Sequence, residues 1–183
     1  MTLTLRQWND SDLAPFAAMS ADPEVMRFFL ATLTTEQSAA MMERIRRTID
    51  EQGWGWWAVE VDGEFAGLTG LSVPKIAAPF MPCTEIAWRF RREFWGRGVA
   101  IEAARKALSF GFETLNLTEI VSFTAAINVP SWKLMERIGF KRDVAGEFDH
   151  PALPEGHTLR RHVLYRLPRD QYSGAAPGVL PAT

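Results

Sequence analysis

Polar and apolar residues alternate over residues 3–8, at the start of the chain. This period of two predicts a first strand. The polar run 9–12 then supplies side-chain caps for a helix that we expect to end near Met19. A second, short helix is predicted over residues 23–29.

A capping-box pattern marks the start of the next helix, because Thr34 is followed three residues later by Gln37. Apolar residues then recur at helical spacing at Ala39, Met42, Ile45 and Ile49. We therefore expect an amphipathic helix that ends at Gly53, since glycine commonly stops a helix.

Aromatic and β-branched residues dominate residues 54–61 and 65–73, and Asp62-Gly63 between them is a strong signal for a hairpin turn. Two antiparallel strands are predicted. A loop with three prolines follows, after which residues 84–90 are predicted to form a strand that ends in an arginine-rich turn.

Helical spacing returns over residues 99–115, where one apolar face consists of Ala100, Ala104, Leu108, Phe112 and Leu115. A strand is predicted over residues 119–125. The next helix carries Pro130 in its first turn and is expected to end at Ile138, before Gly139.

Residues 140–148 and 159–167 are predicted as the closing strands, with a loop between them. This order of strands and helices predicts a mixed α/β sheet in one domain, residues 1–172. Residues 173–183 are rich in Gly, Ala and Pro and lack periodicity, so we expect a flexible tail.

Composition narrows the class of protein. Hydrophobic residues make up 47% of the chain and charged residues 23%, as in soluble globular proteins. The net charge of −2 argues against nucleic acid as the primary ligand. Cys83 is the only cysteine, which excludes an intrachain disulfide, and the three histidines lack metal-ligand spacing. We expect a cytoplasmic protein that binds neither membrane nor metal.

The segment 91–100 has the composition of an anion site. Gly96 and Gly98 let the backbone approach a ligand, and the helix that begins at Val99 directs free amides and a positive dipole toward the same place. The spacing matches neither the dinucleotide fingerprint nor the phosphate-binding loop of nucleotide triphosphatases. A plain glycine turn with a solvated basic face is the alternative.

The run Trp95-Gly96-Arg97-Gly98-Val99-Ala100 resembles the acyl-CoA pyrophosphate loop of GNAT acetyltransferases, [QR]-x-x-G-x-[GA], with Trp95 in place of Gln or Arg. Because Glu102-Ala103 follows, it is similar to the RimJ/RimL branch, which acetylates ribosomal-protein N-termini. Asn128-x-x-Ser131 and the run 136–140 resemble the second motif of that branch.

This resemblance implies a GNAT-type fold, with a mostly antiparallel twisted sheet splayed between strands 84–90 and 119–125. It implies acetyl-CoA as cosubstrate, with a pantetheine arm that enters the splay and contacts backbone groups of Trp88 and Phe90. The residues expected to bind the cosubstrate are Trp88, Phe90, Arg91, Trp95, Gly96, Arg97, Gly98, Val99, Ala100, Asn128 and Ser131.

Acetyl transfer needs a neutral amine, a site for the oxyanion and a proton for the departing thiolate. Many family members use a tyrosine as the acid, but Met135 occupies the matching position, so the resemblance assigns this role to Ser131. A helix cap is the alternative role for Ser131. Glu85 is the candidate base, beside acids and histidines of the loop 149–158 or a water chain.

The acceptor is expected to be a primary amine, either a protein N-terminus or a small molecule. Asp149 and His150 in the late loop, together with Trp57, are the candidate residues for binding it, although strand aromatics more often pack in a core. The acids of this region could attract a cationic amine. The basic residues nearby could instead pair with a carboxylate of the acceptor or with those same acids. These basic residues are Arg160, Arg161 and His162.

Two other functions are alternatives. Met135 in place of tyrosine is compatible with a non-catalytic acyl-CoA sensor or interaction module. Binding of RNA or of the ribosome as the primary function would need a basic surface, which the net charge of −2 does not support, and would show strong salt dependence. We expect a monomer or a homodimer, in which Met81, Pro82 or the tryptophan-rich hairpin could join the subunits.

Overall fold

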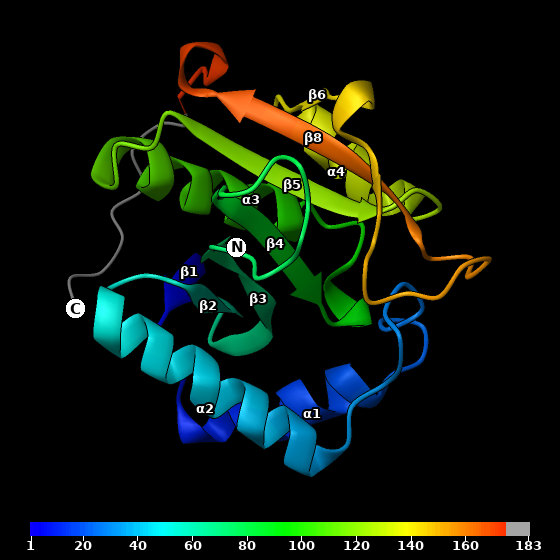
Figure 1. Cartoon of the computed structure of the whole chain (residues 1–183). Coiled ribbons are helices and arrows are strands. Elements are labelled where there is room, and N and C mark those ends of the chain that lie inside the picture. The colour runs from blue at the N-terminus through cyan, green and yellow to red at the C-terminus, as the bar shows by residue number, and fades with distance from the viewer. Residues whose placement is uncertain (175–183) are drawn as a thin grey trace.

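The computed structural model describes residues 1–174 and contains one sheet with the strand order β1-β2-β3-β4-β5-β8-β6, with β7 paired to β8 (Figure 1). Every pairing is antiparallel except that of β4 with β5. The predicted mixed, mostly antiparallel sheet is thus confirmed. The strands are β1 (Leu3–Arg6), β2 (Trp56–Val61), β3 (Glu64–Ser72), β4 (Glu85–Phe90), β5 (Glu119–Ala125), β6 (Lys141–Arg142), β7 (Phe148–Asp149) and β8 (Arg161–Pro168).

Helices pack on both faces of this sheet. The first two cover one face, where Phe16 of α1 packs against Phe65. The third covers the opposite face, where Phe110 directly after α3 packs against Trp57. The helices are α1 (Leu13–Ala21), α2 (Thr35–Gln52), α3 (Val99–Ser109) and α4 (Val129–Arg137). None of the helices in this part of the chain is long and apolar enough to span a bilayer.

The caps predicted from the sequence are present. The Thr34 hydroxyl accepts from the Gln37 amide at 3.2 Å while the Gln37 side chain accepts from the Thr34 amide at 2.9 Å. Gly53 ends α2 in the left-handed conformation, with φ of 81°. In the β2–β3 turn, Asp62 and Gly63 both have positive φ, of 51° and 86°, as a type I′ hairpin requires.

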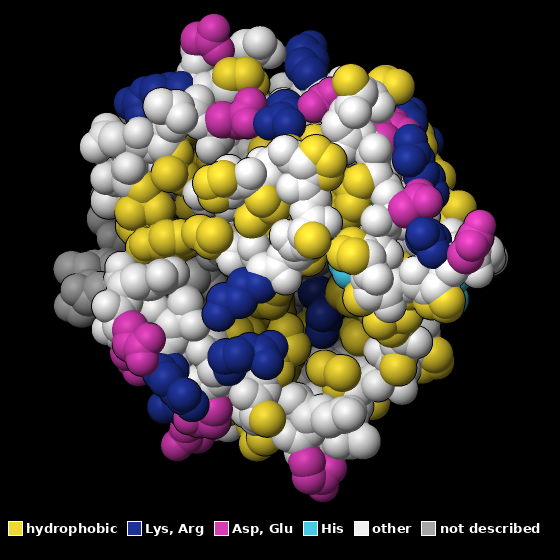
Figure 2. Space-filling view, in the orientation of Figure 1, with side chains coloured by type: hydrophobic (Ala, Val, Ile, Leu, Met, Phe, Trp, Pro, Cys, Tyr) yellow, Lys and Arg dark blue, Asp and Glu magenta, His cyan; other side chains and the backbone are white. Residues whose placement is uncertain are grey.

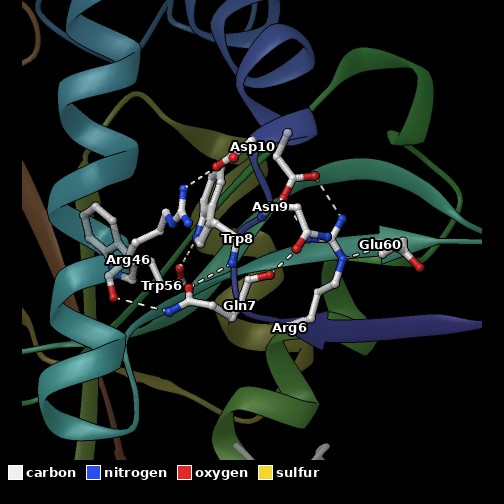
Figure 3. Close-up of polar contacts among 9 residues, drawn as sticks. Arg6, Gln7, Trp8, Asn9, Asp10, Arg46, Trp56 and Glu60 are labelled. Carbon is white, nitrogen blue, oxygen red and sulfur yellow. Dashed lines mark hydrogen bonds and ion pairs between the residues drawn. The ribbon is translucent and has the colours of Figure 1, made fainter.

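A half-buried arginine joins β1 to both of its neighbours. Arg6 donates to both carboxylate oxygens of Asp12, at 2.7 and 2.9 Å, and to Glu60 on β2 at 2.7 Å (Figure 3). The neighbouring indole of Trp8 donates to the Trp56 carbonyl at 2.7 Å. These contacts raise the pKa of Arg6 above its ordinary value, chiefly through the hydrogen bond to Asp12. The start of α1 is therefore attached to the sheet by charge-assisted hydrogen bonds.

The sheet opens between β4 and β5, as the family resemblance implies. Their register contains one Cα pair, Glu85 with Val121. The Val121 amide donates to the Thr84 carbonyl at 2.9 Å, and the Ser122 hydroxyl donates to the Ile86 carbonyl at 3.0 Å. Because backbone groups of alternate residues face the same side of a strand, those of Trp88 face the gap that opens beyond this point.

Three predicted elements differ in the structure. Residues 23–29 form turns, not a helix, because Val25 and Met26 are adjacent and both buried while Phe28 packs on a separate small cluster. The predicted helix 99–115 ends as α3 at Ser109 and continues as a π-helical turn, Phe110–Thr114. In that turn a Cβ on Gly111 would lie 2.7 Å from the Ile120 side chain.

The predicted strand 140–148 is also wrong as one element. It is divided into β6 and β7 by a 3-10 turn, Val144–Gly146. Asp143 causes the break, because its carboxylate accepts from the Gly146 amide at 3.0 Å and from Arg166 of β8 at 2.7 Å. The predicted tail lies outside the described residues from position 175 onward.

Candidate active site

A cavity of about 1030 Å³ lies at the splay of the sheet. Its walls come from β4, β5, the first turn of α3, α4, the turns after α1 and the loop before β8. Figure 2 shows a hollow near the middle of this face, with hydrophobic side chains around it and basic side chains at its edge and inside. Acidic side chains gather toward the periphery of the same view.

One end of the cavity is the start of α3. Gly96 and Gly98 have φ of 71° and 80°, and a Cβ at either position would meet no atom within 4 Å. Gly98 is the N-cap and supplies no side-chain cap, so the first amides of α3 keep their hydrogen-bonding capacity. An open space in front of uncapped helical amides suits a phosphate group.

Most of the predicted cosubstrate residues line this cavity together: Trp88, Phe90, Trp95, Gly96, Gly98, Val99, Ala100, Asn128 and Ser131. The Trp95 indole donates to the Phe90 carbonyl at 2.9 Å, which fixes the loop against the end of β4. Tryptophan at this position therefore has a structural role.

Two predicted basic residues lie outside the cavity lining. Arg91 donates to Glu64 at 2.7 Å and to the Phe65 carbonyl at 2.8 Å, so it braces β3. Arg97 is exposed, and its guanidinium lies 5.3 Å from the ring centre of Phe94.

Two predicted acceptor residues also lie elsewhere. Asp149 pairs with Arg160 at 3.3 Å and with Arg161 at 3.7 Å. Trp57 is buried against Phe110, with ring centres 5.1 Å apart, on the far face of β2. Its neighbour Trp56 lines the cavity instead, because successive strand residues face opposite sides.

The start of α4 places the predicted acid. Asn128 is the N-cap; its side-chain oxygen accepts from the Ser131 amide at 3.4 Å and its amide group donates to Thr124 at 2.8 Å. The Ser131 hydroxyl makes no hydrogen bond to any described residue and lies on the cavity wall. Met135, one turn later, is fully buried and carries no transferable proton, whereas the Ser131 hydroxyl does.

Glu85 and His150, both predicted from the sequence, also line the cavity. Burial raises the pKa of Glu85 to about 8. Its carboxyl group has no hydrogen bond or ion pair within residues 1–174, so its ionised form could take a proton from an amine as the pH rises through 8.

His162, which the sequence indicated only as a possible partner for a carboxylate, also lines the cavity. Burial lowers the pKa of His162, and its ring centre lies 5.0 Å from that of His150. Its Nδ1 lies 3.1 Å from the Arg160 carbonyl. A neutral ring that donates from Nδ1 keeps a lone pair on Nε2, so His162 is a second possible base. The position of His162 is set by its pairing with Ala125 on β5, a residue distant in sequence, so no local pattern could have indicated it.

Sequence reasoning missed Arg89 altogether. This residue of β4 lines the cavity, and its Nε atom is buried without a hydrogen-bond partner. Alternation along β4 was the available signal, because it places Arg89 on the same face as Glu85.

A helix start with free amides, a splayed central sheet and titratable groups beyond it are what a transferase that uses an acyl-CoA thioester requires. Residues 2–141 match the family model described as an acetyltransferase (GNAT) domain. The chain therefore belongs to the GNAT acetyltransferase family, whose members are acetyl-CoA-dependent N-acetyltransferases.

Individual relatives agree with this assignment. The chain is 29% identical over 161 residues to FsC-acetyl coenzyme A-N(2)-transacetylase of Aspergillus fumigatus, covering 84% of this chain and 68% of that protein. It is 27% identical to the spermidine N(1)-acetyltransferase of Escherichia coli strain K12, covering 85% and 80%.

Solved structures share the fold. A GNAT-family acetyltransferase from Bacillus anthracis superposes with a TM-score of 0.76 at 22% identity, covering 93% of this chain and 96% of that one. The spermidine N-acetyltransferase of Vibrio cholerae, solved with CoA and spermine, gives a TM-score of 0.71 at 21% identity, covering 93% and 97%.

Proposed function

We propose that this protein transfers the acetyl group of acetyl-CoA to a primary amine by direct attack in a ternary complex. The observation that carries the proposal is the continuous cavity from the uncapped start of α3, through the splay, to Glu85. The acceptor is a protein N-terminus, as in the RimJ/RimL branch, or a small-molecule amine. A cytoplasmic location fits both.

The cosubstrate would lie along this cavity. Its pyrophosphate would accept hydrogen bonds from the amides of residues 96–101, where Gly96 and Gly98 leave the space open. The amides of its pantetheine arm would pair with the free backbone edge of β4 at Trp88, as a missing strand would. Asn128 lies on the facing wall and could bond the same arm.

The proposed reaction uses groups of this chain, the thioester and the amine. The amine nitrogen attacks the thioester carbon, and Glu85 or His162 takes the amine proton. A backbone amide at the splay stabilises the oxyanion, a contribution of about 3 to 4 kcal/mol. The carbon–sulfur bond then breaks, and the thiolate takes a proton from Ser131.

A non-catalytic acyl-CoA sensor is the second candidate. Met135, fully buried at the position where many relatives carry the acidic tyrosine, favours it. The two functions separate in one assay, because a sensor binds acetyl-CoA tightly and releases no CoA thiol with any amine.

The first experiment is calorimetric titration with acetyl-CoA, desulfo-CoA and NADH, on the wild type and on Gly98→Trp. Both CoA compounds should bind, NADH should bind weakly if at all, and Gly98→Trp should lose at least about tenfold in affinity because the indole fills the phosphate space.

Gly53→Trp is the matched control. Gly53 has the same left-handed backbone, with φ of 81°, and the same empty surroundings, but it ends α2 away from the cavity. It should keep full affinity. A folded wild type that binds no CoA compound would overturn the proposal.

A further inference from the structure

The cavity contains a cation that the chain does not neutralise. Arg89 extends from the face of β4 that α1 covers, and its Nη1 lies 3.4 Å from the Ser20 hydroxyl. Its guanidinium lies 4.3 Å from the ring centre of Phe29. No acidic side chain of residues 1–174 lies within ion-pair distance of it.

Unpaired polar groups gather at this place. Within residues 1–174, the buried side-chain nitrogen and oxygen atoms that lack a hydrogen-bond partner are Arg89 Nε and Trp56 Nε1. Both are donors, and both residues line the cavity. A buried donor without an acceptor costs about 1 to 3 kcal/mol, and more when it is charged. Such a cost is expected where a ligand supplies the acceptor.

The acids of the cavity do not balance this charge. Glu24 forms an ion pair with Arg27. Burial raises the pKa of Glu85 to about 8, so this carboxyl is mostly protonated at neutral pH. Burial lowers the pKa of Arg89 to about 10, which still leaves it charged. The acceptor side of the cavity is therefore positive, and it disfavours a polycation.

We propose that the amine acceptor also carries a carboxylate, and that Arg89 binds that carboxylate through its guanidinium. This inference rests on the acetyltransferase function proposed above. A guanidinium presents parallel donors that match a carboxylate, and stacking on Phe29 holds the guanidinium plane in place. Trp56 Nε1 offers a further donor to a polar group of the same molecule.

The position of Arg89 assigns it to the acceptor and not to the cosubstrate. Its contacts, Ser20 and Phe29, belong to α1 and the turns after it. Glu85, the proposed base, lies on the same face of β4, four residues or roughly 13 Å away along the strand. An acceptor with its amine at Glu85 and its carboxylate at Arg89 would bridge the space between the ends of these two side chains, which both line the cavity.

The test compares acceptors that differ only in charge. Acetylation rates are measured for β-alanine, 4-aminobutyrate, 6-aminohexanoate and the α-amino acids, each beside its carboxamide, and for spermidine. The wild type should prefer a carboxylate over its carboxamide by at least about tenfold in kcat/KM. Arg89→Gln should remove this preference, and Arg89→Lys should restore part of it.

Arg137→Gln is the matched control, because Arg137 lines the same cavity from α4. It should leave the preference between each carboxylate and its carboxamide unchanged. If it removed the preference as strongly as Arg89→Gln does, general cavity charge would explain the selectivity and the proposal would fail.

Calorimetry with acetyl-CoA separates this inference from the function on which it rests. Acetyl-CoA affinity should be the same in the wild type and in Arg89→Gln. Weaker acetyl-CoA binding by Arg89→Gln would assign Arg89 to a phosphate of the cosubstrate and overturn the inference, while the acetyltransferase function would stand. Wild-type protein that acetylates spermidine or the carboxamides at least as fast as the carboxylates would overturn it as well.

Discussion

Arg6 and Arg89 stand at the two ends of one row of cross-strand partners, which runs from Arg6 through Ala58 and Leu68 to Arg89. Cross-strand partners share a face, so α1 lies over both arginines. Arg6 has three hydrogen bonds to carboxylate oxygens, whereas Arg89 has none. One arginine is satisfied by folding, and the other is left for a ligand.

The difference follows from what lies beside each residue. Arg6 finds Asp12 only six residues away along the chain and Glu60 on the adjacent strand. Arg89 finds Leu68 across from it, Phe29 above it and a neutral hydroxyl at the limit of hydrogen-bonding distance. The two environments therefore predict opposite responses to substitution.

The largest expected effect is on stability at the satisfied end of the row. Arg6→Gln should lower the free energy of unfolding by about 3 kcal/mol, because it leaves the buried Asp12 carboxylate without its cation. Arg89→Gln should cost less than about 1 kcal/mol, because no partner loses a charge. Urea denaturation of both variants measures the contrast. Equal losses in the free energy of unfolding would contradict the difference between a paired and an unpaired arginine.

The next effect comes from giving Arg89 a partner of its own. Ser20→Asp places a carboxylate beside the Arg89 guanidinium, where the serine hydroxyl now lies. Carboxylate acceptors should lose about tenfold in kcat/KM, since the new pair occupies the donors. Ser20→Asn is the uncharged control. Unchanged acceptor kinetics in a folded Ser20→Asp protein would argue against the role of Arg89.

The smallest effect is a pH dependence, at Glu85 on the same face as Arg89. With a pKa of about 8, Glu85 becomes a base as the pH rises through 8, so kcat/KM should rise across this range and lose that limb in Glu85→Gln. Steady-state rates from pH 6 to about 9.5 test this. A wild-type profile that Glu85→Gln leaves unaltered would transfer the role of base to His162.

The same pKa has a consequence for stability. The folded protein holds the Glu85 proton at pH values where the unfolded chain, with the ordinary pKa of 4.5, releases it. Stability should therefore fall as the pH rises from 4.5 to 8. Glu85→Gln should be more stable than the wild type above pH 8 and similar to it below pH 4.5, as thermal unfolding at both ends would show.

Local signals predicted much of this molecule from its sequence. The Thr34 capping box, the Asp62-Gly63 turn and the glycine loop before α3 each depend on residues within a few positions of one another. The residues expected to bind the cosubstrate could be predicted for the same reason, since one short segment carries most of them. Family resemblance then supplied the position of the splay.

Features that depend on distant partners could not be predicted in the same way. Whether Trp56 or Trp57 faces the cavity depends on the register of β2 with β3. The exposure of Arg89 to the cavity depends on α1 and on the turns that replace the predicted helix 23–29. His162 reaches the site through its pairing with β5, nearly forty residues earlier in the chain.

The opening between β4 and β5 also has a kinetic signature. A central strand normally has the slowest amide hydrogen exchange of a domain, because both of its edges are paired. Beyond Ile86, whose carbonyl accepts from Ser122, β4 is joined to β3 alone, so the Trp88 amide should exchange with solvent as fast as an edge-strand amide. Acetyl-CoA would supply the missing neighbour and slow that exchange, so an amide at the centre of the fold reports whether the site is occupied.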